Sequence, residues 1–274
     1  MTTALDPVPT ANELVPITGS RQSRARSDLF DPRPSGPADR IGARWSAHRP
    51  IVTALFVLLY AYVALALVTV GIGLVVVATL TDTWLGERDL SVNRWLVDAR
   101  TPTWNAVSLV GSTLANTPVV VAVAGVAVIA LLLTRRWPAA LFLTAGLLLE
   151  VTVFVTAAFL VDRDRPDVVR LDQAPPTSSY PSGHTAASVA LYIGLALVLF
   201  SITRLLALRI AGFVAASSLV VFVAVSRMYR GMHHLSDVIA GVLLGAACLA
   251  AALLAARTAR AVEARRAEIG EASP

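Results

Sequence analysis

Three short polar segments beside long apolar runs hold most of the chemically reactive residues in the second half of the chain. They are Arg163-Asp164-Arg165-Pro166, Tyr180-Pro181-Ser182-Gly183-His184, and Ser226-Arg227 followed by His233 and Asp237. Charged and histidine side chains that border apolar runs of membrane-spanning length are costly unless they are paired or functional. We therefore take these three segments as the candidate site and ask what chemistry their residue types allow.

The spacing of His233 and Asp237 suits a nucleophilic histidine. The two residues are four positions apart, so they share one face of a helix that begins near His233. A carboxylate in that position can hold the imidazole in one tautomer. The second ring nitrogen is then free to attack an electrophile.

The other residues of these segments suit a phosphate group. Arg165 and Arg227 have planar guanidinium groups that bind phosphate oxygens in pairs. Ser182 and Gly183 come just before an apolar run, where serine caps a helix, glycine allows close backbone approach, and free N–H groups suit an anion. His184 can protonate a leaving alkoxide, and such help typically contributes about 10²–10⁴-fold to a rate. This combination of charge and positioning is what phosphoryl transfer needs.

The second and third segments resemble two motifs of one known family. They match the Pro-Ser-Gly-His motif and the Ser-Arg, five residues, His, three residues, Asp motif of the type-2 phosphatidic-acid phosphatase (PAP2) family, which shares its fold with vanadium haloperoxidases. The resemblance covers about residues 100–240. It implies that His233 is the nucleophile, Asp237 its orienter and His184 the general acid. The phosphate-binding residues would be Arg165, Ser182, Gly183 and Arg227.

The resemblance also implies chemistry without a cofactor. Arginine and backbone donors replace a metal ion in stabilising charge on the phosphoryl group, and the nucleophile is already part of the protein. We therefore expect no metal and no other cofactor.

The first segment matches the family only in part. The family's opening motif is a lysine followed after six residues by Arg-Pro, and only Arg165-Pro166 is present. Ala158 stands where the family has lysine, and the sequence contains no lysine at all. Arg163 either replaces the missing cation or lies at the membrane interface, and both interpretations stay open.

The composition predicts an integral membrane protein. Hydrophobic residues make up 56% of the 274 residues, whereas about 45–50% is usual for a globular domain. They form uninterrupted runs near the roughly 20 residues that a spanning helix needs. The runs fall at about 51–80, 118–134, 137–161, 184–203, 205–226 and 235–256.

These runs predict an all-α fold, a bundle of about six transmembrane helices within one membrane domain at residues 50–257. Residues 1–49 are basic and rich in proline and serine, with no sustained period, which predicts a disordered tail. No secretory signal pattern is present at the start. Residues 81–117 contain Trp84, Trp95 and Trp104, which indicates an amphipathic stretch at the interface, with a short re-entrant piece as the alternative.

The arginines predict an orientation. They flank alternate connections, at the N-terminal tail, residues 135–136, residues 204–209 and the C-terminal segment 258–274. By the positive-inside rule these ends are cytoplasmic, and the active site then faces the extracytoplasmic side of the cell membrane. Membrane lipids are the expected surroundings.

Other classes of function are disfavoured. The formal net charge is +5, but the basic residues form no stripe interleaved with aromatic residues. This argues against nucleic-acid binding. The single cysteine, Cys248, permits no intrachain disulfide. Zinc is disfavoured because the adjacent His233 and His234 would point about 100° apart on a helix, and no His-Glu-x-x-His pattern occurs.

Glu150 falls in the middle of the run at 137–161. An intramembrane carboxylate is a functional hypothesis by default, and a protonated packing residue is the alternative. We left both open.

The expected activity is hydrolysis of a lipid phosphate monoester or pyrophosphate through a phosphohistidine intermediate. By resemblance the candidate substrates are phosphatidic acid, phosphatidylglycerol phosphate and polyprenyl pyrophosphates, and an apolar chain entering sideways between helices suits all three. The alternatives are a non-catalytic lipid-phosphate binder, which the absent lysine favours, and a lipid phosphotransferase. A haloperoxidase fits less well, because members of that branch are usually soluble.

Overall fold

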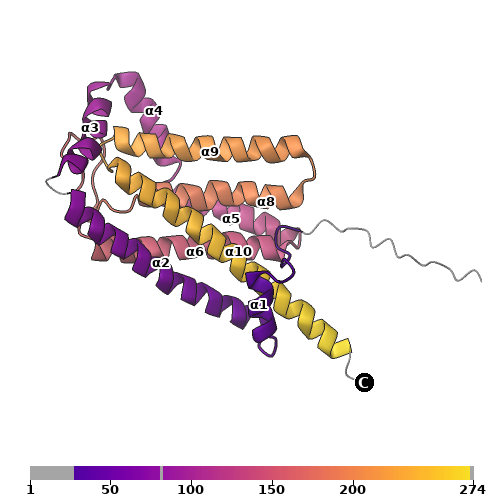
Figure 1. Ribbon diagram of the computed structural model, residues 1–274. Coiled ribbons are helices and arrows are strands. Elements are labelled where there is room, and N and C mark those ends of the chain that lie inside the picture. Colours follow the sequence, from indigo (N-terminus) through magenta and orange to yellow (C-terminus); the bar gives the residue numbers. More distant parts are fainter. Residues whose placement is uncertain (1–27, 81–82, 272–274) are drawn as a thin grey trace, which may run out of the picture.

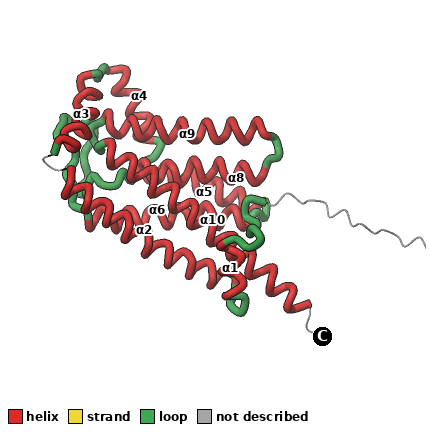
Figure 2. The backbone as a smooth tube through the Cα atoms, viewed as in Figure 1, coloured by secondary structure: helices red, strands yellow, loops and turns green. Residues whose placement is uncertain are grey.

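The computed structural model describes residues 28–80 and 83–271, and these residues form helices and loops (Figure 1, Figure 2). The helices are α1 (Pro37–Arg44), α2 (Pro50–Leu80), α3 (Trp84–Asp98), α4 (Pro102–Thr113), α5 (Thr117–Leu133), α6 (Trp137–Leu160), α7 (Gly183–Ser188), η1 (Val189–Ile193), α8 (Gly194–Ile202), α9 (Leu206–Tyr229) and α10 (Leu235–Glu271). The prediction of an all-α membrane bundle is confirmed.

Among the described residues, five helical stretches are long and apolar enough to cross a membrane. They are α2, α6, the continuous run Gly183–Ile202, α9 and α10. A sixth span arises if α4 and α5 count as one helix bent by 49°. The 17 residues of α5 cover only about 26 Å at 1.5 Å per residue, less than the roughly 30 Å of hydrocarbon in a bilayer. The bent pair together can complete the crossing.

The core lies where α6 packs against α10 and the span formed by α7, η1 and α8. Phe142, Leu143 and Val153 of α6 are fully buried, as is Leu191 of η1. In contrast, α2 leaves many large apolar side chains exposed, among them Leu59. This helix lies along the outside of the bundle (Figure 1), where lipid can cover such side chains.

Two glycines four residues apart let α10 approach α7 closely. A Cβ atom at Gly241 would lie 2.5 Å from the Ser182 carbonyl oxygen, and one at Gly245 would lie 2.6 Å from the Ala186 carbonyl oxygen. Small residues at this spacing are typical of close helix contacts in membranes. The contact sets the start of α7 against the start of α10, the two helix ends that carry His184 and Asp237.

The prediction of a disordered tail over residues 1–49 is wrong from residue 28 onward. Helix α1 docks on the distal part of α10, where Gly42 leaves room for Ala261 and Asp39 forms a 2.5 Å ion pair with Arg265. The ring of Phe30 packs against Phe142 with 5.6 Å between centroids. A helix of eight residues is too short to show a clear period in sequence, and these partners are more than 100 residues away. Residues 1–27 lie outside the described residues.

The two other predicted segments outside the spans are also helical where they are described. Helix α10 continues without a break through the predicted boundary at 257 and ends at Glu271, so residues 258–271 extend a span. The predicted interfacial stretch contains α3 and α4, and Trp84, Trp95 and Trp104 are exposed there. Residues 81–82 and 272–274 lie outside the described residues.

The close approach of α10 to α7 predicts the effect of one methyl group. Gly241→Ala should destabilise the protein by about 1–3 kcal/mol, because the added carbon meets a backbone oxygen that cannot move cheaply. Gly71→Ala, on α2, is the matched control because a Cβ there meets no atom within 4 Å. The control should be neutral or stabilising by up to about 1 kcal/mol. Thermal unfolding in detergent measures both, and equal midpoints for the two variants would contradict the packing argument.

Candidate active site

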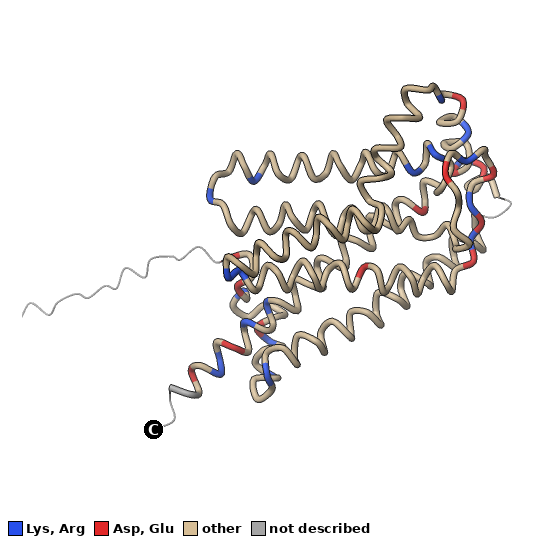
Figure 3. The backbone as a smooth tube through the Cα atoms, turned by 180° about the vertical axis from the view of Figure 1, so that it is seen from behind, with Lys and Arg blue, Asp and Glu red and all other residues tan. Residues whose placement is uncertain are grey.

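The three polar segments meet at one end of the bundle. The Ser182 backbone N–H donates to the Asp237 carbonyl oxygen at 2.9 Å, and Arg165 Nη1 donates to the Met232 carbonyl oxygen at 2.8 Å. Figure 3 shows charged residues gathered at this end, around the loops, with an almost uncharged stretch of bundle behind them. The structure therefore places residues from all three predicted segments in one region.

His233 is held by a backbone carbonyl. It is 4% exposed, and its Nδ1 lies 2.8 Å from the Ser179 carbonyl oxygen. A carbonyl can only accept, so Nδ1 carries the proton and Nε2 keeps its lone pair. The pKa of His233 is lowered to about 3, mainly by burial and further by the positive charge of Arg227. The side chain is thus a neutral imidazole at physiological pH, with Nε2 as its unprotonated nitrogen.

Asp237 contacts His233 less directly than the spacing indicated. Its Oδ2 is 4.0 Å from His233 Nδ1, beyond hydrogen-bond distance. The same oxygen accepts from the His234 backbone N–H at 2.9 Å. Because His234 immediately precedes α10, Asp237 occupies the third position of the helix and closes its first turn as an acidic half of a capping box. The hydrogen bond that holds the imidazole therefore goes to the Ser179 carbonyl, while Asp237 holds the loop that carries His233. An orienting role for Asp237 stays a prediction.

Arg163 lies between two buried carboxylates. Its guanidinium group pairs with Asp237 and with Asp89 of α3 at 2.9 Å, and Nη1 donates to Ser236 Oγ at 2.7 Å. Asp89 also accepts from the Ser236 backbone N–H at 3.0 Å. The charge of Arg163 is therefore matched by carboxylates. This geometry favours a positioning role for Arg163 over both earlier interpretations, replacement of the missing lysine and a place at the membrane interface. Arg163 therefore does not replace the cation that the family has at the position of Ala158.

Arg165 and Arg227 each keep one donor free of protein partners. Arg227 Nη1 donates to Ser112 Oγ at 2.6 Å, while its Nε, like that of Arg165, is a buried donor with no hydrogen-bond partner among the described residues. The charges of both arginines act on both His184 and His233. Buried donors that the protein leaves unpaired are costly, and a phosphate oxygen is the kind of acceptor that would satisfy them.

Asp172 is a site residue that the sequence reasoning missed. Its carboxylate accepts two hydrogen bonds from Arg230, at 2.8 Å and 2.5 Å, and one from Arg227 Nη1 at 3.2 Å. Burial raises the pKa of Asp172, but the Arg230 hydrogen bonds and the charges of both arginines outweigh it and lower the pKa overall. Asp172 is therefore ionised, and it fixes the arginine that follows Ser226.

His184 begins a helix that is capped as predicted. Ser182 is the N-cap of α7, and its Oγ accepts from the Thr185 N–H at 3.4 Å. A Cβ at Gly183 would meet the Phe154 ring at 2.7 Å, so only glycine fits there. His184 Nε2 lies 2.8 Å from Asn116 Oδ1 at the start of α5. Asn116 was also missed, because nothing near it in sequence marks it as polar machinery.

Asn93 and Glu150 are two further buried polar residues. Asn93 of α3 is fully buried, and its Nδ2 donates to the carbonyl oxygens of Met228 and His233, which ties α3 to the third segment. Glu150 is buried in the middle of α6 among the side chains around Val153 and Cys248, away from the site. Within residues 28–80 and 83–271, no three His, Cys, Asp or Glu side chains are grouped to hold a metal ion.

Comparisons with known proteins agree with this architecture. Residues 139–261 match the family model of the PAP2 superfamily. A solved structure described as the first transmembrane PAP2-type phosphatidylglycerolphosphate phosphatase, from Bacillus subtilis, has a TM-score of 0.57 and 21% identity, covering 75% of this chain and 97% of that chain. LpxE from Aquifex aeolicus has a TM-score of 0.49 and 23% identity, covering 60% and 93%. At 21% identity the first likeness shows a common fold. A search of the curated proteins found no match.

The placement of Arg163 predicts coupling to Asp89. Removing one partner of a buried ion pair typically costs about 3–5 kcal/mol, so Arg163→Ala and Asp89→Ala should each lower stability by that order. The double variant should lose less stability than the sum of the two single losses, and the difference, the coupling energy, should be about 0.5–3 kcal/mol. Urea unfolding in detergent measures this cycle. Arg170→Ala, which removes an exposed arginine of the same loop, is the control and should have little effect.

The same variants separate positioning from charge replacement. If Arg163 supplied the missing cation to the phosphate, Ala158→Lys would restore activity to Arg163→Ala. We expect no such rescue, because the loss comes from Asp237 and its loop. Clear rescue by Ala158→Lys, with no coupling to Asp89, would contradict the positioning role.

Proposed function

We propose that this chain, whose residues 139–261 match the family model of the PAP2 superfamily, is a membrane phosphatase that hydrolyses a lipid phosphate. The observation that carries the proposal is His233, with its proton fixed on Nδ1 by the Ser179 carbonyl, beside two arginines whose buried Nε donors have no hydrogen-bond partner within the described part of the chain. The candidate substrates are phosphatidic acid, phosphatidylglycerol phosphate and polyprenyl pyrophosphates. The Bacillus subtilis protein of the same fold is described as acting on the second of these.

In the first step, Nε2 of His233 attacks phosphorus, the bond from phosphorus to the leaving oxygen breaks, and His184 gives that oxygen a proton. The product is a phosphohistidine with positive charge on the ring, which the Ser179 carbonyl stabilises through Nδ1–H. In the second step His184 takes a proton from water, the water oxygen bonds to phosphorus, and the P–N bond breaks to release inorganic phosphate. The acid of one step is thus the base of the next.

Charge stabilisation comes from the protein. Arg165 and Arg227 hold the equatorial oxygens, with the backbone N–H groups after Ser182 as further donors. One hydrogen bond between charged groups is worth about 1.5–3 kcal/mol, so losing either arginine should cost about one to two orders of magnitude in kcat/KM. We propose that no metal ion takes part, because these donors supply the stabilisation.

The absence of lysine at Ala158 supports one alternative, a binder of lipid phosphates that does not turn them over. A lipid phosphotransferase would use the same phosphohistidine but release it to an alcohol instead of water. The products distinguish the three: inorganic phosphate, no product, or a new lipid phosphate.

The catalytic proposal predicts that purified protein releases inorganic phosphate from at least one of the three substrates with a chelator present. His233→Ala should abolish release while binding and folding persist. Acid hydrolyses a phosphohistidine, so alkaline quenching with labelled substrate should trap base-stable, acid-labile label on His233. With a substrate whose leaving group needs no proton, His184→Ala should slow only the second step and more label should accumulate. Undiminished turnover by His233→Ala would refute the mechanism, and inhibition by chelator would point to a metal.

The pH dependence follows from the same residue. Because the folded pKa of His233 is lowered to about 3, its neutral, nucleophilic form persists as pH falls from 7 towards 4. Any loss of activity in that range should therefore come from another group. In His184→Ala, with a substrate whose leaving group needs no proton, the single-turnover rate of labelling of His233 should show no titration of His233 between pH 7 and 4.

We also propose the orientation, with the site outside the cell membrane, the membrane domain at about 50–257 and the C-terminal segment 258–274 in the cytoplasm. In a Cys248→Ser background, Ala174→Cys in the exposed α6–α7 loop should react with an impermeant maleimide in intact cells. Ala267→Cys, exposed near the end of α10, is the matched control and should react only after permeabilisation. The reverse pattern would invert the assignment.

A further inference from the structure

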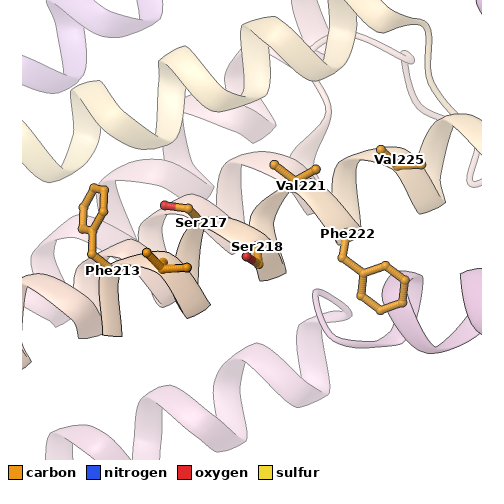
Figure 4. Close-up of a pocket in the computed structure, with 7 residues that line it drawn as sticks. Phe213, Ser217, Ser218, Val221, Phe222 and Val225 are labelled. Carbon is orange, nitrogen blue, oxygen red and sulfur yellow. The ribbon is translucent and has the colours of Figure 1, made fainter. Parts of the chain in front are cut away.

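An apolar pocket lies at the end of the bundle opposite the active site, between α1, α2 and α10. It has a volume of about 410 Å³, and its lining includes Ile41, Trp45, Phe56, Val57, Tyr60 and Leu254. A second hollow, on the outer face of α9 around Phe213 and Phe222, is lined by a single helix (Figure 4). The first pocket differs because residues of three helices, with Trp45 at the end of α1, line it.

The length of α10 gives the position of this pocket along the membrane normal. Leu254 comes 19 residues after Leu235, the first residue of α10, which is about 29 Å along a helix at 1.5 Å per residue. Because the hydrocarbon of a bilayer is roughly 30 Å thick, Leu254 lies near the membrane boundary opposite the site. Figure 1 shows α1 crossing α10 at that end, far from α3.

Aromatic side chains form the outward wall of the pocket. The Trp45 ring packs on the Phe56 ring with 5.2 Å between centroids and 51° between planes. Tyr60, about one turn after Phe56 and further into the membrane along α2, is 80% exposed. Aromatic residues at the boundary between headgroups and hydrocarbon are typical of lipid contact. The pocket is therefore open to the bilayer.

The mouth of the pocket carries an unbalanced positive charge. Residues 28–49 and 257–269 contain eight arginines and five acidic residues. Three of those acids are already paired: Asp28 and Asp31 with Arg260, and Asp39 with Arg265. Arg44 and Arg49, on either side of the turn that holds Trp45, are exposed and have no ion pair among the described residues. An anion would complement them.

We propose that this pocket binds an anionic glycerophospholipid of the leaflet facing away from the active site. Its phosphate would lie at Arg44 and Arg49, and one acyl chain would follow the pocket beneath Trp45 to Tyr60 and Leu254. An apolar cavity open to hydrocarbon fits the chain, and two unpaired arginines at the boundary fit the headgroup. The site is about a bilayer thickness from His233, so the inference does not rest on the proposed catalytic function.

Quenching of Trp45 tests the proposal. Trp84, Trp95, Trp104 and Trp137 are replaced by Phe, and the protein is reconstituted with brominated phosphatidylglycerol or brominated phosphatidylcholine as a minor component of unbrominated phosphatidylcholine. Two arginines near an anionic headgroup should give about a tenfold or greater preference for phosphatidylglycerol. Trp45 should therefore be quenched at correspondingly lower fractions of that lipid. Equal quenching by the two lipids would overturn the proposal.

A pair of matched variants locates the effect. Arg44→Gln with Arg49→Gln should remove the preference, whereas Arg135→Gln with Arg136→Gln, an equal charge loss in the α5–α6 connection at the same end, should keep it. Loss in both would show a general surface effect and refute a specific site. Weak quenching by either lipid, together with a stable dimer, would identify a second copy of the chain as the occupant instead.

Native mass spectrometry of the protein with all five tryptophans provides a second measurement that does not depend on the Phe background. Wild type should retain one phosphatidylglycerol more than Arg44→Gln with Arg49→Gln does, and as many as the Arg135 and Arg136 control. The same number of bound lipids in all three proteins would refute the proposal.

Discussion

The complete burial of the Asp237 carboxylate is the constraint around which the site is built. A buried carboxylate loses its hydration and is tolerated only where donors replace the water. Three donors do so: the guanidinium of Arg163, and the backbone N–H and the side-chain Nδ1–H of His234. Arg163 brings a further requirement, because it is itself buried and pairs with Asp89. One charge thus fixes α3, the α6–α7 loop and the start of α10 relative to one another.

A second carboxylate repeats this arrangement beside Arg227, one of the two arginines proposed to bind phosphate. Asp172 binds Arg230 through two hydrogen bonds and contacts Arg227 through one. Asp89, Asp172 and Asp237 are thereby matched to arginines. Among the described residues, the Nε donors of Arg165 and Arg227 remain unpaired. Donors fixed before the substrate arrives need no reorganisation during the reaction, which is the main source of electrostatic catalysis.

The apolar bundle contributes distance and alignment. Gly241 and Gly245 let α10 contact α7 through backbone atoms, so that the helix starts bearing His184 and Asp237 are set by main-chain packing. The length of α10 then separates this end from the arginine-rich turn at Trp45 by about a bilayer thickness. Two chemically different surfaces, the candidate site with its buried arginines and the exposed arginines beside Trp45, are therefore kept at opposite ends of the bundle.

The fold class and the identity of most site residues were readable from local pattern. Bilayer thickness dictates the length of a spanning helix, so the apolar runs predicted the bundle of about six helices. The motifs fix residue types at short spacing, and they led to the three segments that meet in space. The predicted helix start at Ser182, with its cap, also depended on neighbouring residues alone.

Partners from distant parts of the chain were beyond the reach of such patterns. The Ser179 carbonyl on His233 is 54 residues away, Asn116 is 68 residues from His184, and Asp89 is 74 residues from Arg163. Short-range spacing pointed to Asp237 as the direct partner of His233, but packing placed a backbone carbonyl closer. The sequence did not predict helix α1 for the same reason, because α1 is held in place by its contacts with α10, which is distant in sequence. Sequence spacing constrains which side chains share a helix face, whereas the folding of separate helices onto one another selects which polar groups must satisfy each other.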